Sequence, residues 1–345
     1  MKKTIFTLCL AALALSACKK ADAGIPDWPW YDESDPDNWT EVTDGSFGTL
    51  PSYVKLYSAD SDKIMKGTYP KVYIAVIDAA VTSFNVWGLY DPTLSGSSDA
   101  LRTPTEVYNA CGNPVIVLNG GFFYTDSGIN YPASLAVNEG TFLSPNINYA
   151  SEDWVSVYYP TRGVFVEHSG GSYEAAWTYW CDADHHYLYQ SPAPNSFASA
   201  PCAQPGASYP EGSVAFEAKN AIGGGPVLIK DGKIVNTYVE ELFNGETSGI
   251  LVDTRHPRSA IGITADNKLV LFVCEGREVT PGIPGYTLQE VAKILLSYGC
   301  IEALNLDGGG SSCMLVNGFE TVTPSDEDEN GAHIERSVGS CVYIK

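Results

Sequence analysis

The sequence predicts an α+β fold, with a single domain dominated by mixed β-sheet and only a few helices. Aromatic residues make up 12% of the 345-residue chain, and 21 of them are Tyr, a residue favoured in strands. Short apolar runs and hairpin turns recur from about residue 49 onward, and we find no internal repeat. Two segments, near 103–111 and 287–298, carry the start and stop signals of helices.

The strands are predicted from compact apolar runs and from the turn residues between them. The predicted strands and hairpins lie at Val72–Ile77, Pro114–Leu118, 137–140, 229–233, 260–273 and 315–319. Residues 182–213 contain Pro, Ser and Ala but few other apolar residues, which predicts a long surface loop.

Both predicted helices begin with a capping box, in which a Thr side chain and a Glu three residues later satisfy each other's backbone amides. The first is Thr103-Pro104-Thr105-Glu106, with proline at the favoured first position and Gly112 as the stop. The second is Thr287-Leu288-Gln289-Glu290, and Gly299 ends its amphipathic helix. This helix leads directly into a predicted strand that carries Asp307.

The N-terminus has the pattern of a lipoprotein signal peptide. Lys2 and Lys3 precede a short apolar run, and Leu15-Ser16-Ala17-Cys18 resembles the box in which a cysteine becomes the acylated first residue. We therefore predict a signal over 1–18 and export to the periplasm or cell exterior, with a lipid anchor on Cys18 in the outer or cytoplasmic membrane. An ordinary cleaved signal is the alternative. Residues 19–48 are predicted to be an acidic tether, and 49–345 the domain.

Charge and cysteine content restrict the partners. A formal net charge of −21 argues against nucleic acid and anionic membrane as bulk electrostatic partners. Of nine cysteines, seven follow Cys9 and Cys18, so an oxidising compartment leaves at least one free unless it pairs with another chain. Cys181 and Cys202 flank a loop-like segment and are candidates for a bridge.

No cofactor or metal is predicted, although two motifs contain metal-ligating residue types. Residues 326–331 have the start of a calcium loop, but position twelve is Ser337 rather than an acid. Residues 182–186 combine Asp and His without the helical spacing of a histidine pair.

The glycine-rich stretch 303–312 is the strongest candidate for a site. A strand-like run ends in Asp307, followed by Gly308, Gly309 and Gly310 and then by Ser311 and Ser312. Glycines let backbone amides approach a ligand, and a carboxylate beside amides and hydroxyls suits an anionic or sugar-like group. The alternative is an Asp-Gly turn, but three glycines exceed what a turn needs.

Two further glycine clusters follow predicted strands, and the arginines are concentrated nearby. The clusters are Asn119-Gly120-Gly121-Phe122-Phe123 and Gly223-Gly224-Gly225-Pro226. Four of the six arginines fall in the last 91 residues, namely Arg255, Arg258, Arg277 and Arg336. In so acidic a chain this suggests a clamp for phosphate or carboxylate, whereas surface arginines paired with acids are the alternative.

These motifs, together with His256-Pro257-Arg258-Ser259-Ala260-Ile261-Gly262 and Glu275-Gly276-Arg277, resemble the phosphodiester glycosidase family over roughly residues 70–345. The resemblance implies a hydrolase that cleaves a sugar from a phosphodiester. Two departures concern the substrate: the family commonly has Asp where this chain has Glu275, and Asn near Thr323.

The residues suit this chemistry. Phosphate leaves the anomeric carbon well without protonation, so arginines can stabilise it while one carboxylate acts as base or nucleophile. Asp307 is the first candidate for that carboxylate and Glu275 the second, with Arg258 and Arg277 holding phosphate. The predicted substrate-binding residues are Asn119, Gly120, Gly121, Phe123, Gly224, Gly225, Arg255, Gly308, Gly309, Gly310, Ser311 and Arg336.

Two rival functions remain open. A non-catalytic surface glycan-binding lipoprotein would explain the tether and the aromatic residues, but it has no need for a cluster of acid, arginine and glycine. A scaffold that has lost activity is supported by the Glu275 and Thr323 departures alone.

Overall fold

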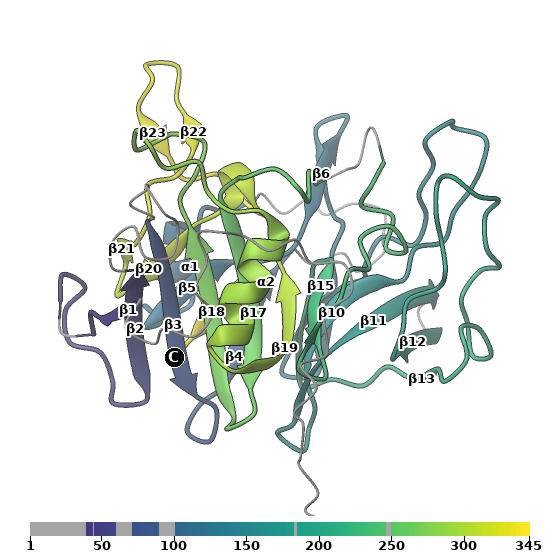
Figure 1. The fold of residues 1–345 in the computed structure, drawn as a ribbon, viewed down its shortest axis with the longest axis horizontal. Coiled ribbons are helices and arrows are strands. Elements are labelled where there is room, and N and C mark those ends of the chain that lie inside the picture. The colour runs from purple at the N-terminus through teal and green to yellow at the C-terminus, as the bar shows by residue number, and fades with distance from the viewer. Residues whose placement is uncertain (1–38, 44, 60–70, 90–100, 183–184, 246–249) are drawn as a thin grey trace, which may run out of the picture.

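The computed structural model describes residues 39–43, 45–59, 71–89, 101–182, 185–245 and 250–345. They form sheets of eight, seven and five strands, two short ribbons and two α-helices (Figure 1). The predicted α+β class is confirmed. Every pairing between the named strands is antiparallel.

The eight-stranded sheet is the centre of the molecule. In spatial order its strands are β1 (Trp39–Glu41), β2 (Val54–Ala59), β3 (Val72–Asp78), β18 (Lys268–Cys274), β17 (Arg258–Thr264), β19 (Cys300–Asn305), β15 (Val227–Lys230) and β16 (Lys233–Ile234). The central strands are apolar on both faces because both faces are covered. Val270 and Phe272 pack beneath helix α2 (Leu288–Ser297), whereas Leu271 and Val273 face the other sheets.

The other two sheets pack on the face of the eight-stranded sheet that lies opposite α2. Side chains of all three sheets form one core cluster there. The seven-stranded sheet runs β13 (Val214–Ala215), β12 (His185–Tyr189), β11 (Tyr173–Asp182), β10 (Arg162–Glu167), β14 (Asn220–Gly223), β8 (Ala136–Asn138) and β9 (Thr141–Ser144). The five-stranded sheet runs β21 (Phe319–Glu320), β20 (Met314–Val316), β5 (Ile116–Asn119), β24 (Ser340–Ile344) and β4 (Phe84–Gly88). The ribbons are β6 (Phe123–Asp126) with β7 (Ile129–Pro132), and β22 (Asp326–Glu327) with β23 (His333–Ile334).

Both predicted helices and their caps are confirmed. Helix α1 (Pro104–Ala110) has Thr103 as its N-cap, and α2 has Thr287, each with the reciprocal Glu contact of a capping box. The predicted hairpins at 137–140, 229–233, 260–273 and 315–319 are also present.

Two boundaries predicted from composition are wrong. The predicted tether over 19–48 extends too far, because β1 at Trp39–Glu41 pairs with β2 and the Phe47 side chain joins the core. The predicted signal, Cys18 and the rest of 1–38 lie outside the described residues. The predicted loop over 182–213 contains β12, whose Leu188 and Tyr189 are buried.

The proposed bridge between Cys181 and Cys202 does not form. Both are thiols, and their Sγ atoms contact the carbonyl oxygens of Pro205 and Pro194 instead, at 3.4 and 3.2 Å. The other five cysteines of the described chain are thiols as well.

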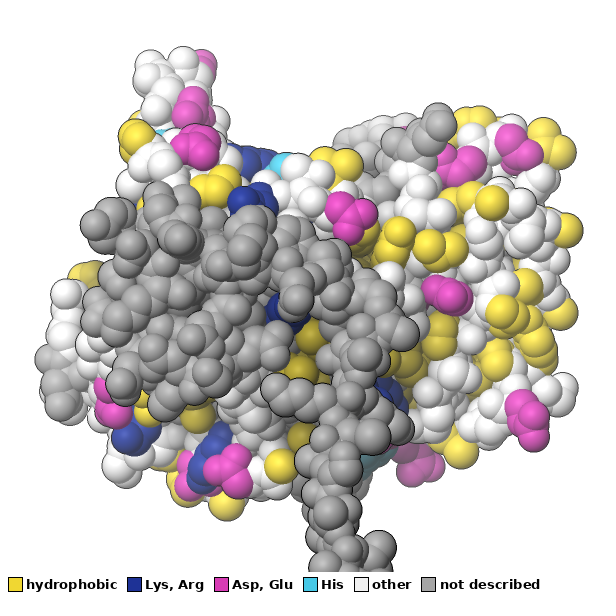
Figure 2. Space-filling view, viewed as in Figure 1, with side chains coloured by type: hydrophobic (Ala, Val, Ile, Leu, Met, Phe, Trp, Pro, Cys, Tyr) yellow, Lys and Arg dark blue, Asp and Glu magenta, His cyan; other side chains and the backbone are white. Residues whose placement is uncertain are grey.

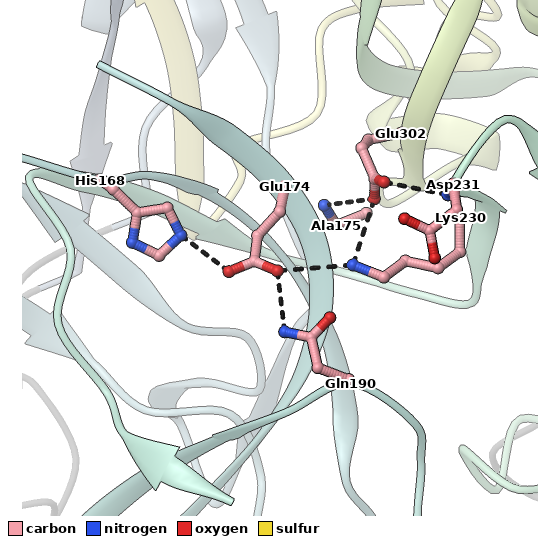
Figure 3. Close-up of polar contacts among 7 residues, drawn as sticks. All are labelled: His168, Glu174, Ala175, Gln190, Lys230, Asp231 and Glu302. Atoms are coloured by element: carbon pink, nitrogen blue, oxygen red, sulfur yellow. Dashed lines mark hydrogen bonds and ion pairs between the residues drawn. The ribbon is translucent and has the colours of Figure 1, made fainter. Parts of the chain in front are cut away.

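A polar network joins the seven-stranded sheet to the eight-stranded one (Figure 3). Glu174 of β11 accepts from Gln190 at 2.9 Å, lies 2.7 Å from the His168 ring and pairs with Lys230 of β15. Lys230 also lies 3.5 Å from Glu302 of β19, whose carboxylate accepts the Ala175 amide at 3.0 Å. The charges at this sheet junction are therefore partnered by protein groups.

The sheets converge where β19 and β5 end. The Leu306 amide still donates to Ser259 of the eight-stranded sheet at 2.9 Å, but the next amide, that of Asp307, donates to Gly120 after β5 at 3.0 Å. Asp307 therefore crosses from one sheet to the other, and this seam fixes the position of the glycine loop.

Candidate active site at the sheet seam

Asn119 holds the backbone of Asp307 in place. Its side-chain amide donates to the Asp307 carbonyl at 2.7 Å, and its side-chain oxygen accepts the Ser259 hydroxyl at 2.6 Å and the Cys313 amide at 3.2 Å. Asn119 is fully buried. It therefore cannot reach a sugar hydroxyl, and its predicted role as a substrate-binding residue is wrong: it positions Asp307.

Replacing Asn119 by Ala is expected to lower the free energy of unfolding by about 2 kcal/mol, because the buried groups that it now pairs lose their partner. Urea unfolding followed by circular dichroism measures this loss. Asn130→Ala in the exposed β6–β7 ribbon, where Asn130 contacts Thr125, is the control and should change stability little. Equal losses in the two variants would contradict the assignment.

The three glycines of the loop make room for neighbouring groups. A side chain at Gly308 would press on the Pro257 carbonyl, and Gly309 has φ +60° and lies under the Arg277 guanidinium. A side chain at Gly310 would displace Arg336 and Asp326. The Gly308 and Gly309 amides donate to the Asp307 side chain and to Pro257, so these two amides are engaged within the protein, although both residues line the smaller of the two cavities at this site. These glycines instead allow two arginines to lie over the loop.

The Asp307 carboxylate is held by two donors. The Gly308 amide donates to Oδ1 at 2.8 Å and the Ser311 hydroxyl to Oδ2 at 2.6 Å, so Ser311 orients the carboxylate. Burial raises the pKa of Asp307 to about 6, against these two hydrogen bonds and the positive charges of Arg336 and Arg277. A carboxylate with such a pKa is ionised at neutral pH and still basic enough to accept a proton.

The raised pKa predicts that ionised Asp307 destabilises the fold. The native state favours the protonated acid. The stability that protonated Asp307 contributes is therefore fully present below the unfolded pKa of 3.8, and it is lost as pH rises through the folded pKa of about 6. We expect Asp307→Asn to be more stable than the wild type by on the order of 3 kcal/mol at about pH 8, and nearly equal to it below about pH 4. Urea unfolding at both pH values measures this; a gain that did not vary with pH would contradict it.

Two cavities meet at Asp307. The smaller, about 240 Å³, is lined by Phe122, Ile250, Leu251, His256, Arg258, Arg277, Asn305, Leu306, Asp307, Gly308, Gly309 and Arg336. The larger, about 620 Å³, is lined by Leu101, Phe122, Phe123, Asp307, Asp326, Ile334, Glu335, Arg336 and Ser337. Basic side chains and a histidine gather beside the β22–β23 hairpin, which itself carries acidic side chains (Figure 2). The smaller cavity is thus the cationic one.

The four predicted clamp arginines have different surroundings. Arg277 lies over Gly309 and donates to the Ser325 hydroxyl at 3.3 Å. Arg258 donates four N–H groups to backbone carbonyls, those of Tyr286, Ile250, Leu251 and Thr254. Within the described chain neither has a carboxylate partner. Burial and the nearby Arg277 lower the pKa of Arg258 to about 10, against the Cys274 thiol, so it stays charged. Arg258 therefore contributes positive charge and part of the cavity wall, whereas four of its N–H donors are already engaged by the protein and not by a ligand.

The other two arginines are paired. Arg336 forms a two-pronged pair with Asp326, at 2.7 and 2.9 Å, while lining both cavities. Arg255 pairs with Glu290 of the α2 cap at 2.6 Å and lines neither cavity. Arg255 therefore lies apart from both of these cavities, and its role as a substrate-binding residue stays a prediction.

Glu275 is a structural carboxylate. It accepts the Thr280 and Thr323 amides at 3.0 Å each and lies 3.3 Å from Lys71. Although burial opposes ionisation, these donors hold its pKa below the ordinary value. Glu275 lines neither of these two cavities, and its role as a second catalytic acid stays a prediction.

The remaining predicted glycines are packing positions. Side chains at Gly120 and Gly121 would meet Ser340 and Ser134, while Gly224 lies against the Asn305 carbonyl and Gly225 against Phe243. They bring the sheets together and line neither of the two cavities described here, so the structure gives them a packing role, and their assignment as substrate contacts stays a prediction. Phe123, in contrast, lines the larger cavity, and its role as a substrate-binding residue stays a prediction.

Two polar residues of the smaller cavity were not among the predicted site residues. His256 and Asn305 both line the smaller cavity, and both carry buried side-chain atoms without a partner. The available signals were the His-Pro-Arg sequence before β17 and an Asn two residues before Asp307.

The residue types considered as metal ligands are otherwise engaged. Asp326 pairs with Arg336, Asp328 accepts amides of its own turn, and His185 lies 2.7 Å from Asp182. Among the described residues no group of three or more His, Cys, Asp or Glu side chains is arranged to hold a metal.

Comparison with known proteins decides the family. The model of the phosphodiester glycosidase family matches residues 112–345, which is well over half of the chain. The chain belongs to this family. All the residues around Asp307 described above, except Leu101, lie within the matched range.

Curated relatives match over shorter segments. The human N-acetylglucosamine-1-phosphodiester alpha-N-acetylglucosaminidase is 38% identical over 123 residues, which is 34% of this chain and 23% of that protein. The SPbeta prophage-derived uncharacterized protein YomE of Bacillus subtilis is 36% identical over 101 residues, or 29% of this chain and 14% of that protein. The matches thus span less than a quarter of either relative.

Solved structures share the fold of the phosphodiester glycosidase domain. The zebrafish N-acetylglucosamine-1-phosphodiester alpha-N-acetylglucosaminidase catalytic domain, auto-inhibited by its pro-peptide, aligns with TM-score 0.55 and 18% identity over 89% of this chain and 87% of that chain. A putative exported protein of Burkholderia pseudomallei aligns with TM-score 0.50 and 18% identity over 79% and 73%. Within the described residues, no helix has both the length and the apolar character to cross a membrane.

Proposed function

We propose that the protein hydrolyses the glycosidic bond of a sugar linked through a phosphodiester. The observation that carries this proposal is the pair Arg258 and Arg277. In a chain of net charge −21, both line a small cavity with Asp307 and neither has a carboxylate partner in the described chain. Guanidinium groups that lie beside a cavity and have no carboxylate partner among the described residues are suited to a phosphate.

The chemistry follows from the charges. The bond between the anomeric carbon and the phosphate oxygen breaks, the electron pair stays on that oxygen, and the arginines stabilise the added negative charge. Asp307 acts either as the base that takes a proton from the attacking water or as the nucleophile that forms a transient ester. Family membership supports the reaction class.

The two cavities orient the substrate. The smaller, cationic cavity takes the phosphate, and the larger one takes the sugar, with the Phe122 and Phe123 rings as apolar surfaces. Asp307 lines both, so it lies where the scissile bond would cross from one cavity to the other. The Glu275 and Thr323 departures are part of one contact, the 3.0 Å bond from the Thr323 amide to Glu275, and neither residue lines a cavity. They therefore give little support to a scaffold that has lost activity.

The test is release of free sugar from a panel of sugar-1-phosphodiesters that differ in sugar and anomeric configuration. We expect the wild type to release sugar and phosphomonoester from at least one member, and Asp307→Asn to release none at the same enzyme concentration. Binding of glycans by a folded protein without turnover of any member would favour the glycan-binding lipoprotein instead.

We also propose that the protein is exported and lipid-anchored through Cys18. The basic start, short apolar run and Leu-Ser-Ala-Cys box support this. Expression with a labelled fatty acid should label the wild type and leave Cys18→Ser unlabelled; label in both would contradict the anchor.

A further inference from the structure

We propose that His256 is a further catalytic residue, whose imidazole donates a proton to the phosphate oxygen that leaves the anomeric carbon. The inference rests on the proposed function, because it assigns a role at the same phosphate. It begins from the cavity: His256, Arg277, Asn305 and Asp307 all line the smaller of the two.

The backbone fixes where His256 lies. Its amide and carbonyl exchange hydrogen bonds with Tyr286 at 3.2 and 3.1 Å, just before β17 begins at Arg258. Gly276 and Gly285 pack so closely against it that a side chain at either position would collide with the His256 backbone or with Pro257. The backbone that carries the imidazole is therefore fixed in position. A side chain that must reach a reacting atom needs such a rigid support.

Two side chains of this cavity carry polar atoms without a hydrogen-bond partner among the described residues. Both ring nitrogens of His256 and the side-chain oxygen of Asn305 are shielded from solvent without a hydrogen bond to a described residue. Such atoms normally find partners. A phosphate group supplies acceptors for an imidazole N–H, and a phosphate hydroxyl or a water supplies a donor for the Asn305 oxygen. The cavity thus offers complementary groups to one ligand class, the phosphate ester.

The charges that face His256 explain its protonation. Burial lowers the pKa of His256, and Arg258 and Arg277 lower it further; Arg336 and Asp307 are the other charged groups lining the cavity, and the Cys274 thiol contacts the His256 carbonyl. The ring is therefore less readily protonated than an ordinary histidine when the cavity holds no anion. A bound phosphate adds negative charge that offsets the arginines, so His256 takes up a proton from solvent when substrate binds.

The proton then balances the reaction. As the bond between the anomeric carbon and oxygen breaks, its electron pair stays on the phosphate oxygen, and that oxygen takes the His256 proton. With Asp307 as base, the water oxygen bonds to the anomeric carbon and the water proton goes to Asp307, then to solvent. With Asp307 as nucleophile, neutral His256 accepts the proton of the water that opens the ester.

The kinetic test compares leaving groups. His256→Gln keeps the size and polarity of the side chain, and we expect kcat to fall about 10²–10⁴-fold on an alkyl phosphodiester of the sugar. The loss should be at least tenfold smaller on the corresponding aryl phosphodiester, whose leaving phosphate is less basic. His185→Gln, at an exposed histidine paired with Asp182, is the control. Equal losses on both substrates would indicate a purely structural role and overturn the proposal.

The direct test is an NMR titration of the five histidines of the full chain, with and without inorganic phosphate, using His256→Gln to assign the His256 signal. We expect phosphate to raise the pKa of His256 by at least about one unit, and Arg277→Ala to weaken both phosphate binding and this rise. Phosphate binding that leaves the His256 pKa unchanged would overturn the role of His256 and leave the proposed function standing. If phosphate does not bind at all, both are overturned.

Discussion

Asp307→Asn is expected to lower kcat on a sugar phosphodiester by about 10²–10⁴-fold, because the amide can neither accept the water proton nor attack the anomeric carbon. The Gly308 and Ser311 donors hold the carboxylate at the junction of the two cavities, so the variant should keep the fold and lose the chemistry. Release of free sugar under saturating substrate measures the loss.

The matched control removes a carboxylate of the same type at the far end of the same sheet. Asp266 accepts the Thr264 hydroxyl at 2.6 Å in the turn between β17 and β18, and it lines neither cavity. Asp266→Asn should retain wild-type turnover. Wild-type turnover in Asp307→Asn, with unchanged circular dichroism, would remove Asp307 from its role.

Arg277→Ala is expected to lower kcat/KM by about 10²–10³-fold, since Arg277 is the cavity arginine whose donors are least committed to the protein. Among the described residues the Arg277 side chain donates to the Ser325 hydroxyl at 3.3 Å, whereas Arg258 donates to four backbone carbonyls. Inhibition by inorganic phosphate should weaken in parallel, which ties the effect to the phosphate and not to the sugar.

Arg255→Ala controls for the loss of one positive charge in the same part of the chain. Its guanidinium is paired with Glu290 and lies outside both cavities, so phosphate inhibition should be unchanged and only stability slightly lowered. Equal weakening of phosphate inhibition in both variants would point to bulk charge and contradict a clamp at Arg277.

Signals local in sequence predicted local structure well. A capping box specifies its own contacts within four residues, so the starts of α1 and α2 follow from Thr103 and Thr287. Hairpin turns act in the same way. Composition was a poorer guide to boundaries, because the acidic residues around Phe47 do not prevent its ring from joining the core.

The sequence predicted which segments form the site, but it did not predict the contacts that each side chain makes there. The sequence indicates that Asp307, the loop glycines and the arginines belong together, but the partner of each side chain depends on distant strands. Asn119 and Glu275 are residue types that often bind ligands. In the fold, however, Asn119 donates to the backbone of Asp307, 188 residues away, and Glu275 accepts the backbone amide of Thr323, 48 residues away. The glycines were expected to expose amides, whereas several of them admit neighbouring side chains and backbone.

The most direct test of the central claim is to follow the oxygen of the attacking water. Hydrolysis of an accepted sugar-1-phosphodiester in ¹⁸O-labelled water, read by the isotope shift in the ³¹P NMR spectrum of the released phosphomonoester, reports which bond breaks. Attack at the anomeric carbon, as the Asp307 and Arg277 arrangement requires, predicts a phosphomonoester without ¹⁸O. Incorporation of ¹⁸O into the phosphomonoester would show cleavage between phosphorus and oxygen, and would contradict a glycosidase.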